Sequence, residues 1–204
     1  LYMACHKGLE TVAMRLLDTG DVDVDVKQTR DGTTPLWQAC YSGLVTVAMR
    51  LLDIGVADVD TKSTASSTTP LWHACCKGLE TVALRLLDTG VVDVDAKSIK
   101  NGTNPLWGAS FKGLKKVALR LLDTGEVDVD AKHTLTGKTT LDCARKKSLN
   151  TVVARILAIQ ESVTPTGLAA RVLSIQESAA PTGLAVTILK AVWRNASEAR
   201  KTST

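Results

Sequence analysis

The sequence predicts an all-α solenoid, in which about five short helix pairs stack on one another and finger loops join successive pairs. Tryptophans recur at a step of 35 residues, at Trp37, Trp72 and Trp107. The same step joins columns of glycine, arginine and paired leucines. Aromatic residues make up only 3% of the chain, so the core must be mostly Leu, Val, Ile and Ala, which suits short, closely packed helices.

The first helix of each copy is expected where a Thr-Pro pair precedes apolar residues. In the stretch TTPLWQACYSG, Thr34 can cap a helix whose first residue is Pro35, a position where the missing N–H costs nothing. The apolar residues that follow share one face, and Gly43 ends the helix.

The second helix is expected over LVTVAMRLLDIG. Its apolar residues Val47, Ala48, Leu51 and Leu52 share a face, and Gly55 supplies a left-handed stop. Helices this short fall below the roughly 12 to 15 residues that give marginal stability in water. Each must therefore gain its stability from neighbours in a stack.

The two ends of the array depart from the pattern. The first copy is incomplete, because the chain begins inside its first helix at Leu1. The fifth copy is degenerate: Thr140, Asp142 and Ser148 stand where the other copies have Pro, Trp and Gly, as is typical of a terminal capping repeat.

A different repeat follows the array. The stretches ILAIQESVTPTGLA and VLSIQESAAPTGLA predict two further helices, over 165–177 and 181–199, that cover the end of the stack. The basic end RNASEARKTST is expected to fray. We therefore divide the chain into a repeat array, residues 1–160, and a helical C-terminal extension, residues 161–204.

The repeated block DGTTPLWQACYSGLVTVAMRLLDIGVADVD, with its two copies STTPLWHACCKGLETVALRLLDTGVVDVD and NGTNPLWGASFKGLKKVALRLLDTGEVDVD, resembles the ankyrin repeat. The family pattern is a turn with Gly, Thr-Pro-Leu-His, a small pair, Gly, a Val-rich stretch, Leu-Leu, Gly and Asp-Val-Asn. The resemblance covers roughly three quarters of the chain. The period is 35 where the family has 33, and Trp replaces the His that links neighbouring loops in the family. An indole donates but does not accept a hydrogen bond, so we expect aromatic packing to replace part of that network.

The alternating run GDVDVDV is predicted to belong to a finger loop. Asp21, Asp23 and Asp25 fit three positions of a calcium loop, but Val26 stands where that loop needs Gly and Gly32 where it needs Glu. We expect these carboxylates to bond turn amides and to meet a column of lysines. That column is Lys27, Lys62, Lys97 and Lys132.

Neither a metal, a cofactor nor catalysis is expected. The stretch TLTGKTT lacks the first Gly of a phosphate-binding loop. Cys5, Cys40 and Cys75 recur at the 35-residue step, which favours small buried residues over metal ligands. The odd number of cysteines and the lack of a signal peptide predict an intracellular protein, cytoplasmic or nuclear. We also expect no membrane span and a monomeric array.

The arginine column is expected to be neutralised. In the first four copies an Asp stands three residues after the Arg, as in Arg50 and Asp53, close enough to pair on one helix. A phosphate-binding rail along the stack is the alternative.

The resemblance implies a concave binding face, made by the finger tips and the end of the first helix of each pair. Residues that vary between otherwise similar copies at these places are the candidates for protein binding, with Tyr41 and Phe111 as aromatic anchors. The candidates are His6, Lys7, Arg30, Asp31, Tyr41, Ser42, Ala65, Ser66, Cys76, Lys77, Lys100, Asn101, Phe111 and Lys112.

The predicted function is a non-catalytic module that binds an unidentified protein partner through this face. One alternative is the targeting or substrate-recruiting arm of a larger enzyme or adaptor, since the first copy is incomplete. Another is a nucleic-acid or anionic-surface binder that uses the Lys and Arg rows. A formal net charge of +4 spread along the chain does not favour nucleic acid.

Overall fold

The computed structural model describes residues 1–55 and 57–163, and all the regular elements of these residues are helices. The chain forms two compact units, Leu1–Val153 and Ala154–Thr204, and α10 belongs to both. The helices are α1 (Tyr2–His6), α2 (Glu10–Thr19), α3 (Pro35–Ser42), α4 (Val45–Ile54), α5 (Pro70–Lys77), α6 (Glu80–Asp88), α7 (Pro105–Lys112), α8 (Lys115–Asp123), α9 (Thr140–Lys146) and α10 (Asn150–Val163). The two helices predicted over 165–177 and 181–199, and the basic end, lie outside the described residues.

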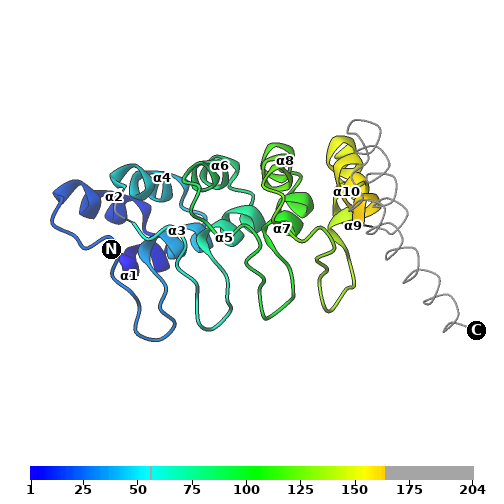
Figure 1. Cartoon of the computed structure of the whole chain (residues 1–204). Coiled ribbons are helices and arrows are strands. Elements are labelled where there is room, and N and C mark those ends of the chain that lie inside the picture. The colour runs from blue at the N-terminus through cyan, green and yellow to red at the C-terminus, as the bar shows by residue number, and fades with distance from the viewer. Residues whose placement is uncertain (56, 164–204) are drawn as a thin grey trace, which may run out of the picture. The chain divides into compact units, whose positions relative to one another are not determined.

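The first unit is an all-α solenoid, as predicted. Each odd-numbered helix from α1 to α9 packs against the next odd-numbered one, and α2, α4, α6 and α8 form a second layer in the same way (Figure 1). The long loops before α3, α5, α7 and α9 project as fingers on the side of the odd-numbered layer (Figure 1).

The starts and ends of the helices follow from the repeated residues. The side chains of Thr34, Thr69 and Asn104 accept a hydrogen bond from the backbone N–H of the third residue of α3, α5 and α7, which confirms the predicted caps. Pro occupies the first turn of all three helices, and the glycine that follows each of them is left-handed. In α9, Asp142 instead forms a capping box with Thr139, so the residue that replaces Trp strengthens a helix start.

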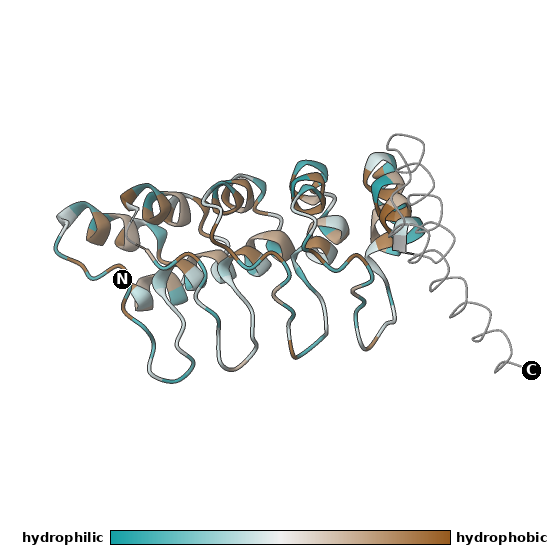
Figure 2. Cartoon of the chain, in the orientation of Figure 1, coloured by the Kyte–Doolittle hydropathy of each residue, from teal (hydrophilic) through white to brown (hydrophobic). Residues whose placement is uncertain are grey.

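The core lies between the two layers. Hydrophobic stretches recur along the helices, whereas the finger loops are mostly hydrophilic or near neutral (Figure 2). Fully buried leucines and valines recur at the 35-residue step, and burying each of these side chains contributes about 1.5–3 kcal/mol. They are Leu36, Leu71, Leu106, Leu51, Leu86, Leu121, Val47, Val82 and Val117.

The tryptophans join neighbouring repeats. The indole Nε1–H of Trp37 donates to the carbonyl of Thr68 at 2.9 Å, in the finger of the next copy. Trp72 and Trp107 donate in the same way to the carbonyls of Thr103 and Lys138, each at 2.9 Å. The loop-to-loop link therefore survives the replacement of His by Trp, because a donor-only group finds a backbone acceptor. Aromatic packing adds to this link without replacing it.

The finger carboxylates form a ladder along the stack. Asp25 accepts from the backbone N–H of Asp58, Asp60 from that of Asp93 at 2.9 Å, and Asp95 from that of Asp128 at 2.9 Å. The predicted role of these carboxylates as acceptors for loop amides is confirmed.

The lysine column meets this ladder between copies. Lys27 pairs with Asp58 at 3.1 Å, Lys62 with Asp93 at 2.6 Å and Lys97 with Asp128 at 2.7 Å. The step is 31 residues, and Val163 stands at that step from Lys132, so the column of pairs within the described residues ends at Lys97.

The arginine column is neutralised, but by different aspartates from those expected. Arg50 pairs with Asp18 at 3.7 Å and Arg85 with Asp53 at 3.2 Å. Arg120 likewise pairs with Asp88 at 3.3 Å. Each arginine therefore reaches back to the preceding copy, because the even-numbered helices lie side by side and bring that aspartate within reach.

Ser67 offers a test of backbone strain in a finger. Its φ is 55°, where the equivalent positions in three other fingers hold glycine, such as Gly32 at 71°. A left-handed residue with a side chain costs about 1–2 kcal/mol, partly offset because Gly is freer in the unfolded chain. We expect Ser67→Gly to stabilise the protein by about 0.5–1 kcal/mol in urea unfolding. The reverse change, Gly32→Ser, should destabilise by a similar amount, since a Cβ there meets no atom within 4 Å. Equal stability of both variants and the parent would contradict this account.

Asp60 and Asp93 should give opposite pH dependences of stability. Burial raises the pKa of Asp60, so its contribution to stability is present below the ordinary pKa of 3.8 and is lost as pH rises through the folded value. For Asp93, burial would raise the pKa, but hydrogen bonds from Lys62 and the Asp95 amide outweigh it and lower the pKa. Its contribution is present above 3.8 and is lost as the pH falls.

We therefore expect Asp60→Asn to raise the free energy of unfolding at pH 7, and Asp93→Asn to lower it, each by less than about 1 kcal/mol. Both differences should shrink towards pH 3, where the carboxyl groups of the unfolded chain are protonated. Urea unfolding at a series of pH values measures them. The same sign for both variants at pH 7 would refute the assignment.

Candidate functional site

The inner face, which we define as the exposed surface of α3, α5, α7 and α9 together with the finger tips, is the candidate functional site. The lysine column on the fingers and the arginine column on α4, α6 and α8 are both engaged by aspartates. A paired, solvent-exposed row presents little net charge, so neither column favours the phosphate-rail alternative.

Tyr41 and Phe111 are held in place by their own helices. Tyr41 is 46% exposed, and its ring stacks on Trp37 with 5.4 Å between centroids and 10° between planes. Phe111 is 44% exposed and stacks on Trp107 at 5.1 Å and 8°. The ring of His73 in the next copy makes a T-shaped contact with Tyr41, with 5.3 Å between centroids. Both aromatic rings therefore present a fixed apolar surface, which loses little conformational entropy when a partner binds.

Lysines and a histidine accompany these rings. The Lys77 ammonium lies 5.2 Å from the centre of Tyr41, and that of Lys112 lies 6.0 Å from the centre of Phe111. In the first copy, exposed His6 stacks on Tyr2 at 6.4 Å, with exposed Lys7 beside it. Ser42, which stands 35 residues after Lys7 and 35 before Lys77, is half-buried and accepts a hydrogen bond from Gln38 at 3.1 Å.

Cys76 is more deeply buried than a residue predicted to contact a partner protein should be. A Cβ on Gly108 would lie 2.7 Å from its sulfur, so the absence of a side chain at position 108 makes room for the thiol. Burial raises the pKa of Cys76 to about 12. This candidate therefore packs between α5 and α7, and it offers a partner less surface than Tyr41 or Phe111 does.

The finger-tip candidates divide into two kinds. Arg30, Ala65 and Lys100 are exposed. Asp31 and Asn101 each accept from the hydroxyl of the Thr two residues on at 2.8 Å, and thereby shape the turn.

Ser66 is only 8% exposed, and its hydroxyl bonds that of Thr68 at 2.7 Å. The carbonyls of Asp31, Ser66 and Asn101 accept from the next finger at 3.0, 3.1 and 2.9 Å. These three residues therefore hold successive fingers together, and the exposed tip residues are the ones a partner can reach.

The inner face of the fifth copy carries exposed residues that are not among the candidates predicted from the sequence. A cavity of about 430 Å³ lies between α7 and α9, and exposed Lys138, Lys146 and Lys147 line it together with Phe111 and Lys112. Leu135, at the tip of the last finger, is 87% exposed. Leu135 stands 35 residues after Lys100, so the 35-residue step predicts its place at a finger tip. It is not among the candidates because the fifth copy is interpreted as a cap.

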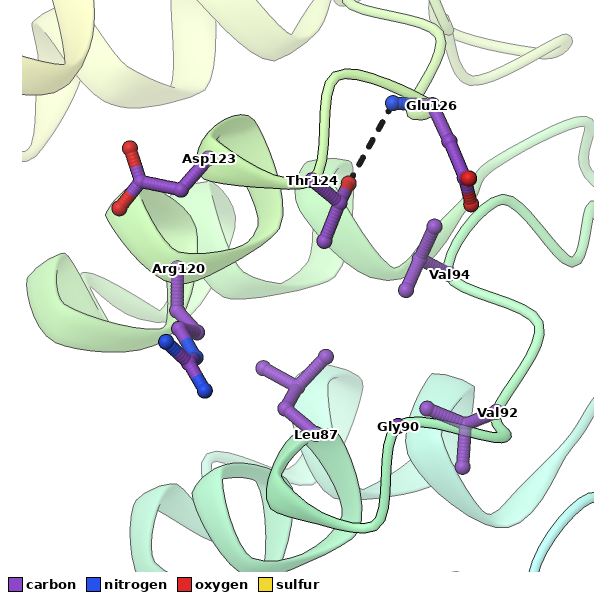
Figure 3. Close-up of a pocket in the computed structure, with 8 residues that line it drawn as sticks. All are labelled: Leu87, Gly90, Val92, Val94, Arg120, Asp123, Thr124 and Glu126. Carbon is purple, nitrogen blue, oxygen red and sulfur yellow. Dashed lines mark hydrogen bonds between the residues drawn. The ribbon is translucent and has the colours of Figure 1, made fainter.

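A second cavity, of about 350 Å³, lies between the ends of α6 and α8 (Figure 3). Leu87, Val92 and Val94 form one side, and polar residues including Arg120 and Glu126 form the other (Figure 3). Arg120 is already paired with Asp88, and the Glu126 amide donates to Thr124 at 3.4 Å. The arrangement holds no nucleophile with an adjacent base.

The titratable groups inside the array are poorly suited to catalysis. Burial lowers the pKa of His73 to about 3, and its Nε2 lies 3.0 Å from the Thr68 hydroxyl, so the ring is neutral and structural. Burial raises the pKa of Cys5 to about 11 and that of Cys40 to about 12, whereas a reactive cysteine needs a lowered pKa.

The described residues contain neither a cluster of metal ligands nor a membrane-spanning helix. Nowhere in 1–55 and 57–163 do three or more His, Cys, Asp or Glu side chains gather as a metal site would require. Across the same residues, every helix is too short or too polar to cross a membrane.

Comparison with known proteins agrees with the solenoid of helix pairs. A model of the ankyrin repeats, in three copies, matches residues 1–98. No curated protein matches the sequence significantly. Beyond residue 98, the same caps, indole links and finger hydrogen bonds continue at the 35-residue step. Residues 1–98 of this chain therefore belong to the ankyrin repeat family.

Proposed function

We propose that the array is a non-catalytic module that binds a partner protein through its inner face and exposed finger tips. Ankyrin repeats are generally protein–protein interaction modules, which gives the class of function. The observation that carries the specific proposal is the pair of exposed aromatic rings, Tyr41 and Phe111, each stacked on a tryptophan of its own helix. Rigid aromatic side chains of this kind are enriched among the residues that dominate protein interfaces.

The spacing of the two rings defines the size of the partner surface. Tyr41 and Phe111 lie on α3 and α7, two helices apart in the odd-numbered layer. At about 10 Å for each helix spacing, the rings are roughly 20 Å apart. An extended segment of about six residues spans that distance.

The proposal includes an intracellular location, cytoplasmic or nuclear. The five cysteines are free thiols and four of them are buried, as suits a reducing compartment. The raised pKa values of these thiols and the lowered pKa of His73 support a role without catalysis.

Affinity capture with the full chain tests the binding face. The variant Tyr41→Ala/Phe111→Ala should recover its partners at least about tenfold less well than the parent, because truncating central aromatic residues costs more than about 1 kcal/mol each. The matched control is Val12→Ala/Val91→Ala, which truncates two exposed apolar residues outside the inner face. Thermal unfolding accompanies each measurement, since the aromatic stacking also stabilises the fold by about 0.5–1.5 kcal/mol for each pair. Equal recovery of the same partners by both folded variants would refute the proposed face.

A further inference from the structure

The cavity between α7 and α9 combines an apolar surface with concentrated positive charge. Its volume of about 430 Å³ falls in the range of sites that enclose a small ligand or one or two side chains. Phe111, fixed on Trp107, supplies the apolar part. The residues that line the cavity are Phe111, Lys112, Lys138, Asp142, Cys143, Lys146 and Lys147.

The lysine stems are positioned by the array itself. Carbon atoms of Lys147 lie 3.7–4.0 Å from where a Cβ of Gly113 would be, and those of Lys112 lie 3.8–4.0 Å from that of Gly78. Each stem therefore lies across the glycine that ends the preceding odd-numbered helix. Packing of the stem restricts where the ammonium group can go, which lowers the entropy lost when an anion binds.

The positive charge of the cavity is not compensated within the described part of the chain. None of its four lysines forms an ion pair with residues 1–55 or 57–163, in contrast to Lys27, Lys62 and Lys97 on the fingers. The one carboxylate, Asp142, is engaged at the start of α9, where it accepts from the Thr139 amide at 3.0 Å and the Thr139 hydroxyl at 2.8 Å. Four lysines against one aspartate leave a local excess of three positive charges.

We infer that this cavity binds an acidic segment of the partner protein, in which Asp or Glu carboxylates meet the lysines and an aromatic or aliphatic side chain packs on Phe111. The inference rests on the proposed protein-binding function and deepens it by giving the chemistry of the bound segment. A nucleic acid fits less well. The arginine and lysine columns that would follow a phosphate backbone along the stack are already paired, which leaves one short basic cluster.

Four fluorescein-labelled nine-residue peptides test the inference on the full chain. They combine either Glu or Gln at the six flanking polar positions with either Phe or Ala at the centre. Fluorescence anisotropy at 50 mM salt gives the affinities, and amide shifts in ¹⁵N NMR spectra give the location. The Glu/Phe peptide should bind most tightly and shift the amides of Phe111, Lys112, Cys143 and Lys146.

Two variants that remove the same positive charge distinguish binding at the cavity from general electrostatic attraction to the chain. Lys112→Gln/Lys146→Gln should weaken the binding of the Glu/Phe peptide about fivefold, because it removes two of the four positive charges that meet the peptide carboxylates. Lys115→Gln/Lys116→Gln removes the same charge from α8, outside the cavity, and should change the affinity less than twofold.

Several outcomes would overturn the inference: equal losses in the two variants, no preference for Glu over Gln, or tighter binding of a labelled nine-nucleotide oligouridine than of the Glu/Phe peptide. Affinity capture distinguishes this failure from that of the proposed function. If Lys112→Gln/Lys146→Gln recovers protein partners as well as the parent does, the array still binds proteins and only the acidic segment is refuted.

Discussion

The rest of the structure depends on the hydrogen bonds that join each repeat to the next. Helices of 8 to 10 residues, such as α3 and α4, are not stable alone in water. Three indoles make the same 2.9 Å bond to the following finger, and finger carboxylates accept from the amides of the next copy. These bonds fix the register in which the buried leucines and valines of successive copies meet. Burial then supplies most of the stability, because its contribution grows with every copy added to the stack.

The contacts between repeats also determine which charged side chains remain free to bind a partner. The aspartates whose amides donate to the preceding copy also pair with the finger lysines: they are Asp58, Asp93 and Asp128. The finger lysines and the arginines of α4, α6 and α8 are therefore already paired with aspartates within the array. Lys112 and Lys147, at the ends of α7 and α9, lie instead on glycine, which offers no opposing charge. A chain with a modest net charge of +4 thus carries a concentrated basic cluster at one place on the inner face.

The helices could be predicted because their signals are local. Thr34, Pro35 and Gly43 act within one turn of the backbone they cap, start or end, and the 35-residue step carries the prediction to the other copies. Contacts between copies could not be predicted in this way. Arg50 reaches an aspartate 32 residues earlier and not the one three residues later, since only the stacked geometry decides which is nearer. The burial of Ser66 and the cavity beside Phe111 likewise depend on how one finger or helix lies against the next.

The variable positions of the inner face are coupled between copies for the same reason. The residue at the end of one odd-numbered helix meets the residue 32 positions later, in the middle of the next. Tyr41 makes a T-shaped contact with His73, Cys76 fills the space left by Gly108, and Phe111 shares its cavity with Cys143. A larger side chain at position 108 would collide with the Cys76 sulfur, so the two positions cannot change independently. What each copy presents to a partner is therefore set by two residues from neighbouring repeats, while the indole links that hold those repeats together stay constant.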